Sequence, residues 1–280
     1  MAIQNFIPTV WSETLYSELE KDYVGVRLCN REFEGEIRGE GDRVKICGVG
    51  PVTVFDYQKN QDMPAAEVLS DKARTLIIDQ SKGLNFCIDS VDKAQAKGGL
   101  MQAAMKEASN ALADVADRYI YELFDEEVPH FEYIDASALE IVSIIANARK
   151  TLMENNVSNS AQLYLEVPPC IEEKLLLANV MHATDNTKAF GKGYLGSFLG
   201  FEVYVSNNLH YDEEKGTYRC VARTGRAIAF AEQLSEVKAY EPELRHGDAV
   251  KGLHLYGAKI VYPKEMVYMD IVPLPNDRVI

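Results

Sequence analysis

The feature that most constrains the fold is a long stretch without proline, from residue 92 to about residue 127. Apolar residues recur there at every third or fourth position, which is the spacing of one face of an α-helix. They are Met101, Met105, Ala108, Leu112, Val115, Tyr119 and Leu123. A helix of about 30 residues spans roughly 45 Å, which is long for a compact domain. The Gly98-Gly99 pair is the weak point, where a break would shorten the helix.

Strand-like runs precede this stretch, between Arg43 and about Ser90. They are residues 44–47, 52–55, 75–78 and 84–88. A polar tip, from residue 58 to residue 71, divides them into two halves. Because an isolated two-stranded excursion is marginally stable in water, we expect this one to pack against another subunit.

Helix and strand patterns alternate over residues 131–234 and predict an α/β domain. The expected helices are residues 137–155 and 170–181, the second with Pro169 near its first turn. The expected strands are residues 161–167, 201–205, 218–221 and 227–231.

Two more strand-like runs, residues 253–261 and 266–272, lie near the end of the chain. The turn-like sequence Tyr262-Pro263-Lys264-Glu265 separates them. This pattern predicts a hairpin. A hairpin needs another element to pack on, and the long helix is the expected partner.

The N-terminal 42 residues are of a different character. Trp11, Leu15 and Leu19 lie four positions apart and share one face of a short helix. The sequence then becomes acidic, with Glu32, Glu34, Glu36, Glu40 and Asp42. Such a polar stretch is expected to be an extended segment that anchors on something else.

Residues 191–196 match the pattern G-x-G-x-x-G. In a dinucleotide site this pattern follows a strand and opens a helix, whose N-terminus meets the pyrophosphate. Here a polar segment precedes it and a strand pattern follows. The motif is therefore interpreted as a loop.

No other local pattern predicts a catalytic, cofactor or metal site. The histidines at positions 130, 182, 210, 246 and 254 show no H-E-x-x-H spacing, and G-x-S-x-G is absent. Adjacent acidic pairs such as Glu126-Glu127 do not face one another on a helix.

The formal net charge of −14 argues against a protein that captures nucleic acid or an anionic membrane by its own affinity. No run approaches the roughly 18 apolar residues of a membrane span, and the N-terminus lacks a signal peptide pattern. We therefore expect no membrane association.

The order of these pieces resembles that of the major capsid proteins of tailed bacteriophages, which have the Hong Kong 97-type fold. Residues 11–15 and 24–26 resemble the arm of the short members of this family, and residues 33–37 and 41–46 resemble the start of their extended loop. Residues 86–95 resemble the junction with the spine helix, and residues 256–261 resemble the closing strand.

The resemblance implies an α+β fold with four parts. Residues 1–42 would be the N-terminal arm, and residues 43–90 the extended loop over a neighbouring subunit. Residues 91–132 and 236–280 would form the peripheral domain with the spine helix. Residues 133–235 would be the axial domain, in which the glycine-rich stretch 191–200 is a loop near the five-fold and six-fold centres.

The implied function is self-assembly into hexamers and pentamers, which form an icosahedral head around double-stranded DNA. The implied location is the virion, after assembly in the host bacterial cytoplasm. Implied partners are further copies of the chain, a scaffolding protein, a portal and a decoration protein. Because the arm begins within ten residues of Met1, the scaffold is expected to be a separate protein. An acidic lining would leave the packaged DNA mobile, without sequence-specific binding.

Candidate contact residues between subunits follow from the same resemblance. They are Trp11, Phe55, Tyr57, Lys59, Lys72, Gly191, Gly193 and Tyr194. Some relatives cross-link a loop lysine to an asparagine of a neighbour. Lys59 and Lys72 lie in or near the tip, but no pattern identifies their partner, so non-covalent contacts are expected.

Two alternative hypotheses remain open at this point. An encapsulin, a bacterial nanocompartment shell, has the same fold and holds an enzyme cargo instead of DNA. A soluble nucleotide-dependent enzyme would use the glycine motif at residues 191–196.

Overall fold

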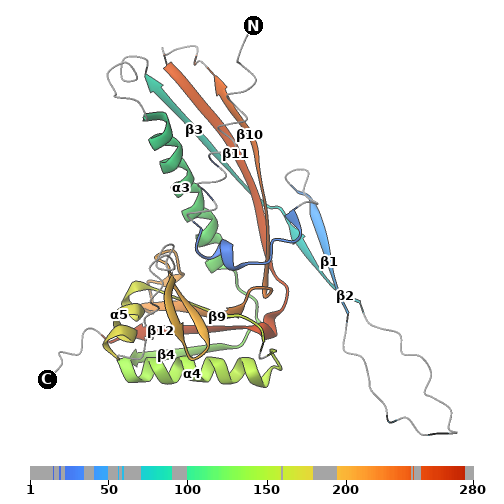
Figure 1. The fold of residues 1–280 in the computed structure, drawn as a ribbon, viewed down its shortest axis with the longest axis vertical. Helices are drawn as coiled ribbons and strands as arrows, with labels where there is room; N and C mark the ends of the chain where they lie inside the picture. Colours follow the sequence, from blue (N-terminus) through green and yellow to red (C-terminus); the bar gives the residue numbers. More distant parts are fainter. Residues whose placement is uncertain are drawn as a thin grey trace.

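The computed structural model describes a chain of two bodies and a two-stranded ribbon (Figure 1). The described residues are 15, 19, 23–34, 41–49, 56, 59, 71–89, 100–158, 160–178, 194–240, 242 and 247–274. Helices and strands are mixed in it, as the sequence predicts. Among the described helices, none is long and apolar enough to cross a membrane.

The first body, the long sheet, is three antiparallel strands with α3 lying alongside (Figure 1). The strand order is β10 (Ile228–Tyr240), β11 (Gly247–Ile260) and β3 (Gln80–Asp89). The predicted long helix is confirmed as α3 (Leu100–Glu122). Met105 and Leu112 are buried as expected, whereas Val115 is 38% exposed because the buried face turns toward Ala116 and Ile120.

The second body is a seven-stranded sheet with helices on one face. Its strand order is β4 (His130–Ala136), β12 (Met266–Pro273), β9 (Thr217–Thr224), β5 (Leu163–Val167), β7 (Phe201–Val205) and β6 (Tyr194–Phe198), with β8 (Tyr211–Asp212) beside β9. Helices α4 (Ala138–Glu154) and α5 (Pro169–Leu177) cover one face. Their buried residues Ile145 and Leu175 belong to one core with Leu165 and Met269. Both helices and the strands at 161–167 and 201–205 are thus confirmed.

The predicted hairpin of residues 253–261 and 266–272 is wrong. β11 pairs with β10 and β3, whereas β12 pairs with β4 in parallel and with β9 in antiparallel orientation. The 3-10 helix η4 (Pro263–Glu265) carries the chain from one sheet to the other. The reason is burial: Met266 to Ile271 are buried on both faces, and such a strand needs a neighbour at each edge.

Because of these pairings, two of the predicted parts, the extended loop and the peripheral domain, do not each lie within one body. β3 falls in the predicted extended loop, but it lies in the long sheet beside β11. β12 falls in the predicted peripheral domain, but it lies inside the seven-stranded sheet.

The ribbon consists of β1 (Arg43–Val49) and β2 (Asp71–Ile77), which pair antiparallel from Arg43 opposite Ile77 to Val49 opposite Asp71. Its base packs on the long sheet, where Ile46 and Leu76 share a core with Leu255. The next residue, Tyr256, points to the opposite face and packs near α3. The ribbon and α3 therefore cover opposite faces. Residues 52–55 and most of the predicted tip lie outside the described residues.

The first prediction concerns the start of α4. Ser137 and Glu140 form a capping box, in which each side chain accepts a hydrogen bond from the other residue's backbone N–H. We expect Ser137→Ala to lower the free energy of unfolding by about 1 kcal/mol, measured by urea unfolding of the unassembled subunit. Ser143→Ala, on the exposed face of the same helix, is the control and should have almost no effect. Equal losses in both variants would contradict the capping role.

Candidate assembly surfaces and the junction behind them

A short N-terminal segment, residues 23–31, lies where the two bodies meet. It contains the 3-10 helix η2 (Val26–Leu28). Tyr23 and Val26 are fully buried and share a core with Ile120 and Tyr268. This part of the predicted arm is therefore not an extended segment, since it packs into the core of its own subunit.

Asp117 on α3 holds the start of this segment. Its carboxylate accepts hydrogen bonds from the backbone N–H groups of Val24, at 2.8 Å, and Val26, at 2.9 Å. The Val26 N–H belongs to the first turn of η2, where no earlier carbonyl is available, and the Val24 N–H lies just before that turn. Burial raises the pKa of Asp117 to about 7, and the backbone hydrogen bonds offset only part of this effect.

Arg223 on β9 holds the same segment from the seven-stranded sheet. It forms a two-pronged ion pair with Glu166 on β5, at 2.8 and 2.9 Å, and both side chains are fully buried. The guanidinium also donates to the carbonyl oxygens of Leu28, at 3.0 Å, and Gly25, at 2.9 Å. The planar fork of arginine suits such simultaneous contacts. Tyr121 of α3 donates to Glu166 at 3.2 Å and connects the pair to the helix.

The glycine at position 25 is required by close packing. A Cβ atom placed there would lie 2.8 Å from the ring of Tyr121. The segment can therefore approach α3 only because residue 25 has no side chain.

Glu232 on β10 holds the segment from the long sheet. Its buried carboxylate accepts a hydrogen bond from the Tyr23 hydroxyl and pairs with Arg31. It also lies 2.8 Å from Nε2 of the buried His254. Burial, with the nearby Glu232 charge, raises the pKa of the Tyr23 hydroxyl well above its usual value, so this group remains a donor.

The other end of the seven-stranded sheet carries a cluster of titratable side chains, His130, Glu132 and Asp270. Their potential metal-ligating atoms lie within 4.8 Å of one another. However, Arg219 donates to both oxygens of Asp270, and Lys215 pairs with Glu132 at 2.8 Å. The carboxylates are therefore already neutralised, and the cluster fits an ion-pair network better than a metal site.

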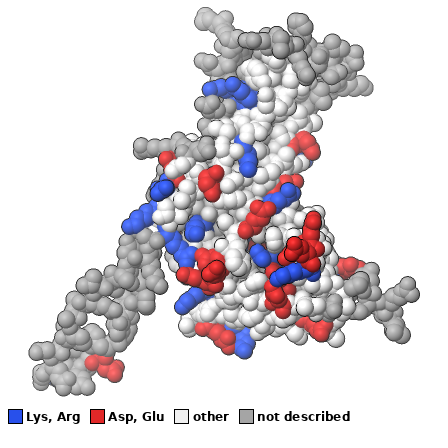
Figure 2. Space-filling model, turned by 180° about the vertical axis from the view of Figure 1, so that it is seen from behind, with Lys and Arg blue, Asp and Glu red and all other residues white. Residues whose placement is uncertain are grey.

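The pKa of Asp270 agrees with this interpretation. Burial alone would raise it, but the contacts with Arg219 and His130 outweigh burial and hold the pKa below its usual value. Acidic and basic side chains are also intermixed on the visible face of this body in Figure 2.

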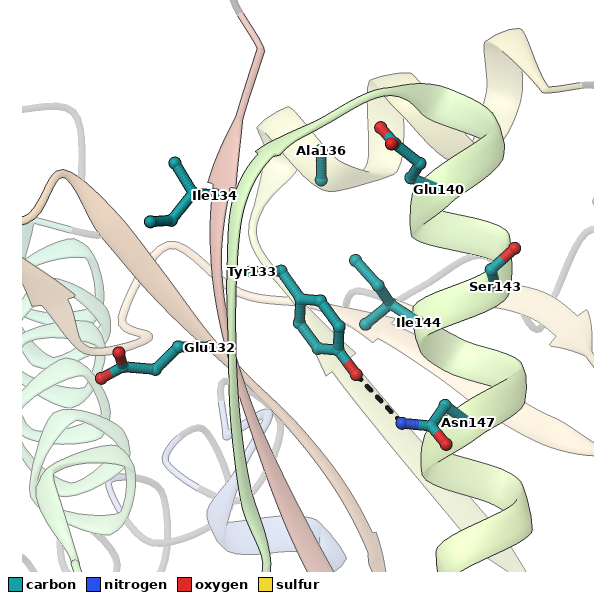
Figure 3. A pocket seen from close by; sticks show the side chains of 8 residues that line it. All are labelled: Glu132, Tyr133, Ile134, Ala136, Glu140, Ser143, Ile144 and Asn147. Atoms are coloured by element: carbon teal, nitrogen blue, oxygen red, sulfur yellow. Dashed lines mark hydrogen bonds between the residues drawn. The ribbon is translucent and has the colours of Figure 1, made fainter.

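The β4 strand presents a candidate assembly surface. Within the described residues it pairs only with β12, so its other edge is open. Between β4 and α4 lies a groove of about 550 Å³. Tyr133 and Ile144 line it in Figure 3, and the Tyr133 hydroxyl accepts a hydrogen bond from Asn147 at 3.0 Å.

Large apolar side chains lie exposed beside this groove. Ile134 is 80% exposed and points away from α4, and Leu139 is 77% exposed. Open strand edges and exposed apolar side chains are typical of protein–protein contacts. The spacing of apolar residues in the expected helix at residues 137–155 predicts Leu139 on or near its apolar face, whereas the structure exposes this side chain. For Ile134 the sequence gives one local signal. Positions 130, 132 and 134 share one face of the strand, and Ile134 is an apolar residue that follows the polar His130 and Glu132 on that face.

The predicted contact residues lie mainly elsewhere. Lys59 is exposed, Lys72 lies in β2 opposite Gly48, and Tyr194 begins β6. The others lie outside the described residues: Trp11, Phe55, Tyr57, Gly191 and Gly193. Their role as contacts stays a prediction. The last glycine of the motif, Gly196, lies within β6 and is followed by β7, so the helix that a dinucleotide site requires does not follow.

The second prediction tests the buried ion pair. Arg223→Met leaves the Glu166 carboxylate unpaired in the core, so we expect a loss of about 3–5 kcal/mol in the free energy of unfolding. The double variant Arg223→Met/Glu166→Leu should lose less than the sum of the single variants, since it removes both charges. Arg226→Met is the control, because Arg226 is exposed and its pair with Glu265 should contribute no more than about 1 kcal/mol. Additive losses in the double variant would contradict the coupling.

The third prediction concerns pH. Because the folded-state pKa of Asp117 is about 7 and the unfolded value is about 3.8, the folded state binds more protons between these values. Its contribution to stability is therefore largest at low pH and is lost as pH rises to 7. The titratable groups that interact with it are Glu166, Tyr121, Cys29 and Tyr23.

Urea unfolding of the wild type and of Asp117→Asn, each at pH 5.5 and pH 8, measures this effect. From pH 5.5 to pH 8, the stability of the asparagine variant should rise by about 2 kcal/mol relative to the wild type. A constant difference between the two proteins would contradict the raised pKa.

Comparison with known proteins gives a matching family and similar solved structures. The family described as phage capsid protein matches residues 87–269, more than half of the 280-residue chain. Comparison with curated protein sequences gives no match.

Solved structures give the same result. The chain is similar to a structure of Mycobacterium phage Che8, with a TM-score of 0.69, 28% identity, and coverage of 88% of this chain and 90% of the other. The capsid of Ralstonia phage GP4 matches with a TM-score of 0.67 and 12% identity over 90% of each chain. A virus-like particle from Pyrococcus furiosus matches with a TM-score of 0.59 and 14% identity, over 92% of this chain and 96% of the other.

The predicted α+β fold of the Hong Kong 97 type is therefore confirmed. The family consists of structural proteins of phage shells, so the hypothesis of a nucleotide-dependent enzyme is wrong. From its sequence match and its fold, the chain belongs to the phage capsid protein family.

Proposed function

We propose that this chain is a major capsid protein whose copies form hexamers and pentamers. These would close into an icosahedral head around double-stranded phage DNA. The observation that carries the proposal is the similarity to the Mycobacterium phage Che8 structure, since it extends over 88% of this chain at 28% identity. The location would be the virion, after assembly in the host bacterial cytoplasm.

The domain roles belong to the same proposal. Residues 1–42 would be the arm, 43–90 the extended loop, 91–132 with 236–280 the peripheral domain, and 133–235 the axial domain. A separate scaffolding protein, a portal and a decoration protein would act with it. Sequence-specific DNA binding is not part of the proposal, since the net charge of −14 opposes capture of DNA by the free subunit.

Self-assembly has support from the surface of the subunit. Among the described residues, β4 and β6 are the two end strands of the seven-stranded sheet, and the exposed Ile134 and Leu139 lie on the β4 side. A contact between unlike surfaces of neighbouring copies repeats from subunit to subunit and closes into rings or shells. We therefore assign the surface beside β4 to contact with a second copy.

An encapsulin remains the second candidate because the virus-like particle from Pyrococcus furiosus has a similar fold. At 14% identity that similarity concerns the fold alone. Purified particles distinguish the candidates, since a capsid encloses nuclease-protected DNA and an encapsulin encloses an enzyme cargo. Particles from infected or lysogenic cells should be examined by negative-stain microscopy, light scattering and analysis of their contents. A stable 31.3 kDa monomer under all conditions would contradict both candidates.

The fourth prediction tests the β4 surface. Ile134→Asp introduces a charge at an apolar position that is 80% exposed in the subunit. Because burial of an unpaired charge at a contact is costly, the yield of shells should fall sharply, while the unassembled subunit keeps its stability. Ile134→Val is the control and should assemble normally. Normal shells from Ile134→Asp would show that this surface is not a contact.

A further inference from the structure

The two bodies are joined by connections that all lie at one level of the molecule (Figure 1). Among the described residues, the chain passes between them from α3 to β4, from β9 to β10 and from β11 to β12. A junction of this kind would act as a hinge unless further contacts restrain it. Direct hydrogen bonds across it run from Tyr121 to Glu166, from Asn208 to Asp114 and from Tyr268 to the Leu123 carbonyl oxygen, and apolar residues of both bodies share one core.

The N-terminal segment, residues 23–31, adds contacts to α3 and to both sheets at this junction. Asp117 binds it from α3, and Arg223 binds it from the seven-stranded sheet. The long sheet binds it through the backbone of Asn30, which accepts from Phe230 N–H and donates to the Ile228 carbonyl oxygen, each at 2.9 Å. Movement of one body relative to the other would break at least one of these sets.

Loss of the contacts between the N-terminal segment and the two bodies is costly because the side chains that make them are buried. Asp117 is 2% exposed, and Arg223 is fully buried. Without the segment, Asp117 would lose its two backbone donors, and Arg223 would lose the Leu28 and Gly25 carbonyl oxygens. Buried polar groups that lose their partners carry the full cost of desolvation. The segment therefore has one favourable position, and so do the two bodies.

We infer that residues 23–31 are a clamp that fixes the angle between the long sheet and the seven-stranded sheet, and that this angle sets the curvature of the shell. The inference rests on the proposed function. In a shell built from repeated contacts, the geometry of each subunit determines where the shell closes. A subunit with a variable angle would give shells of several sizes. Asp117 is a positioning residue here, since it acts through the segment.

The test compares Asp117→Ala with a matched control, Asp270→Ala. Both aspartates are buried, at 2% and 5% exposure, and both bind partners that would be left unpaired. Asp270, however, pairs with Arg219 and His130 inside the seven-stranded sheet, and neither ion pair includes a residue of the clamp. Shells of the wild type and both variants are assembled under one set of conditions, and their diameters are measured by microscopy.

We expect both variants to lower the melting temperature. Only Asp117→Ala should shift the mean diameter by more than the width of the wild-type distribution, or give open and irregular shells. Wild-type diameters from Asp117→Ala, or an equal change from Asp270→Ala, would overturn the clamp. Absence of shells from the wild type would instead contradict the proposed function.

A milder variant covers the case in which Asp117→Ala does not fold. Asp117→Asn keeps one oxygen acceptor for the segment, so it should fold and give a diameter distribution broader than that of the wild type. A wild-type distribution from Asp117→Asn, or failure of this variant to fold, would then count against a role in shell geometry.

Discussion

The structure depends on one constraint: the charged groups buried at the junction are tolerated only while each keeps its partners. An unpaired charge there would cost on the order of 3–5 kcal/mol. The partners come from distant parts of the chain, since Arg223 pairs with Glu166 and binds the carbonyls of Gly25 and Leu28. The long sheet, the seven-stranded sheet and the N-terminal segment are therefore stable together, as a single unit.

Local periodicity predicted much of this fold but little of the junction. The long helix, α4 and strands β5 and β7 follow from the spacing of apolar residues, and the start of α5 follows from the proline at its first turn. The pairing of β12 with β4 and β9 does not, because a strand pattern contains no information about distant neighbours. The same applies to Asp117, whose place in the apolar stretch of a helix makes sense only once Val24 and Val26 lie against it.

The sequence alone does not predict the candidate assembly surface either. Ile134 occupies an ordinary strand position, and its exposure results from the place of β4 at the edge of the sheet. The contact residues inferred from the family resemblance belong instead to the predicted arm, the predicted extended loop and the glycine-rich stretch, and most of them lie outside the described residues. The geometry of the described residues adds the flank of the seven-stranded sheet.

The position of β12 in that sheet has a consequence for synthesis of the protein. β12 lies between β4 and β9, although residues 266–273 are made long after both neighbours. While the ribosome adds the intervening residues, β4 lacks its partner strand and β9 has one unpaired edge, and such edges are prone to non-native association. The sheet closes only after residues 266–273 have been made, so chains interrupted before residue 266 are poor candidates for incorporation into a shell.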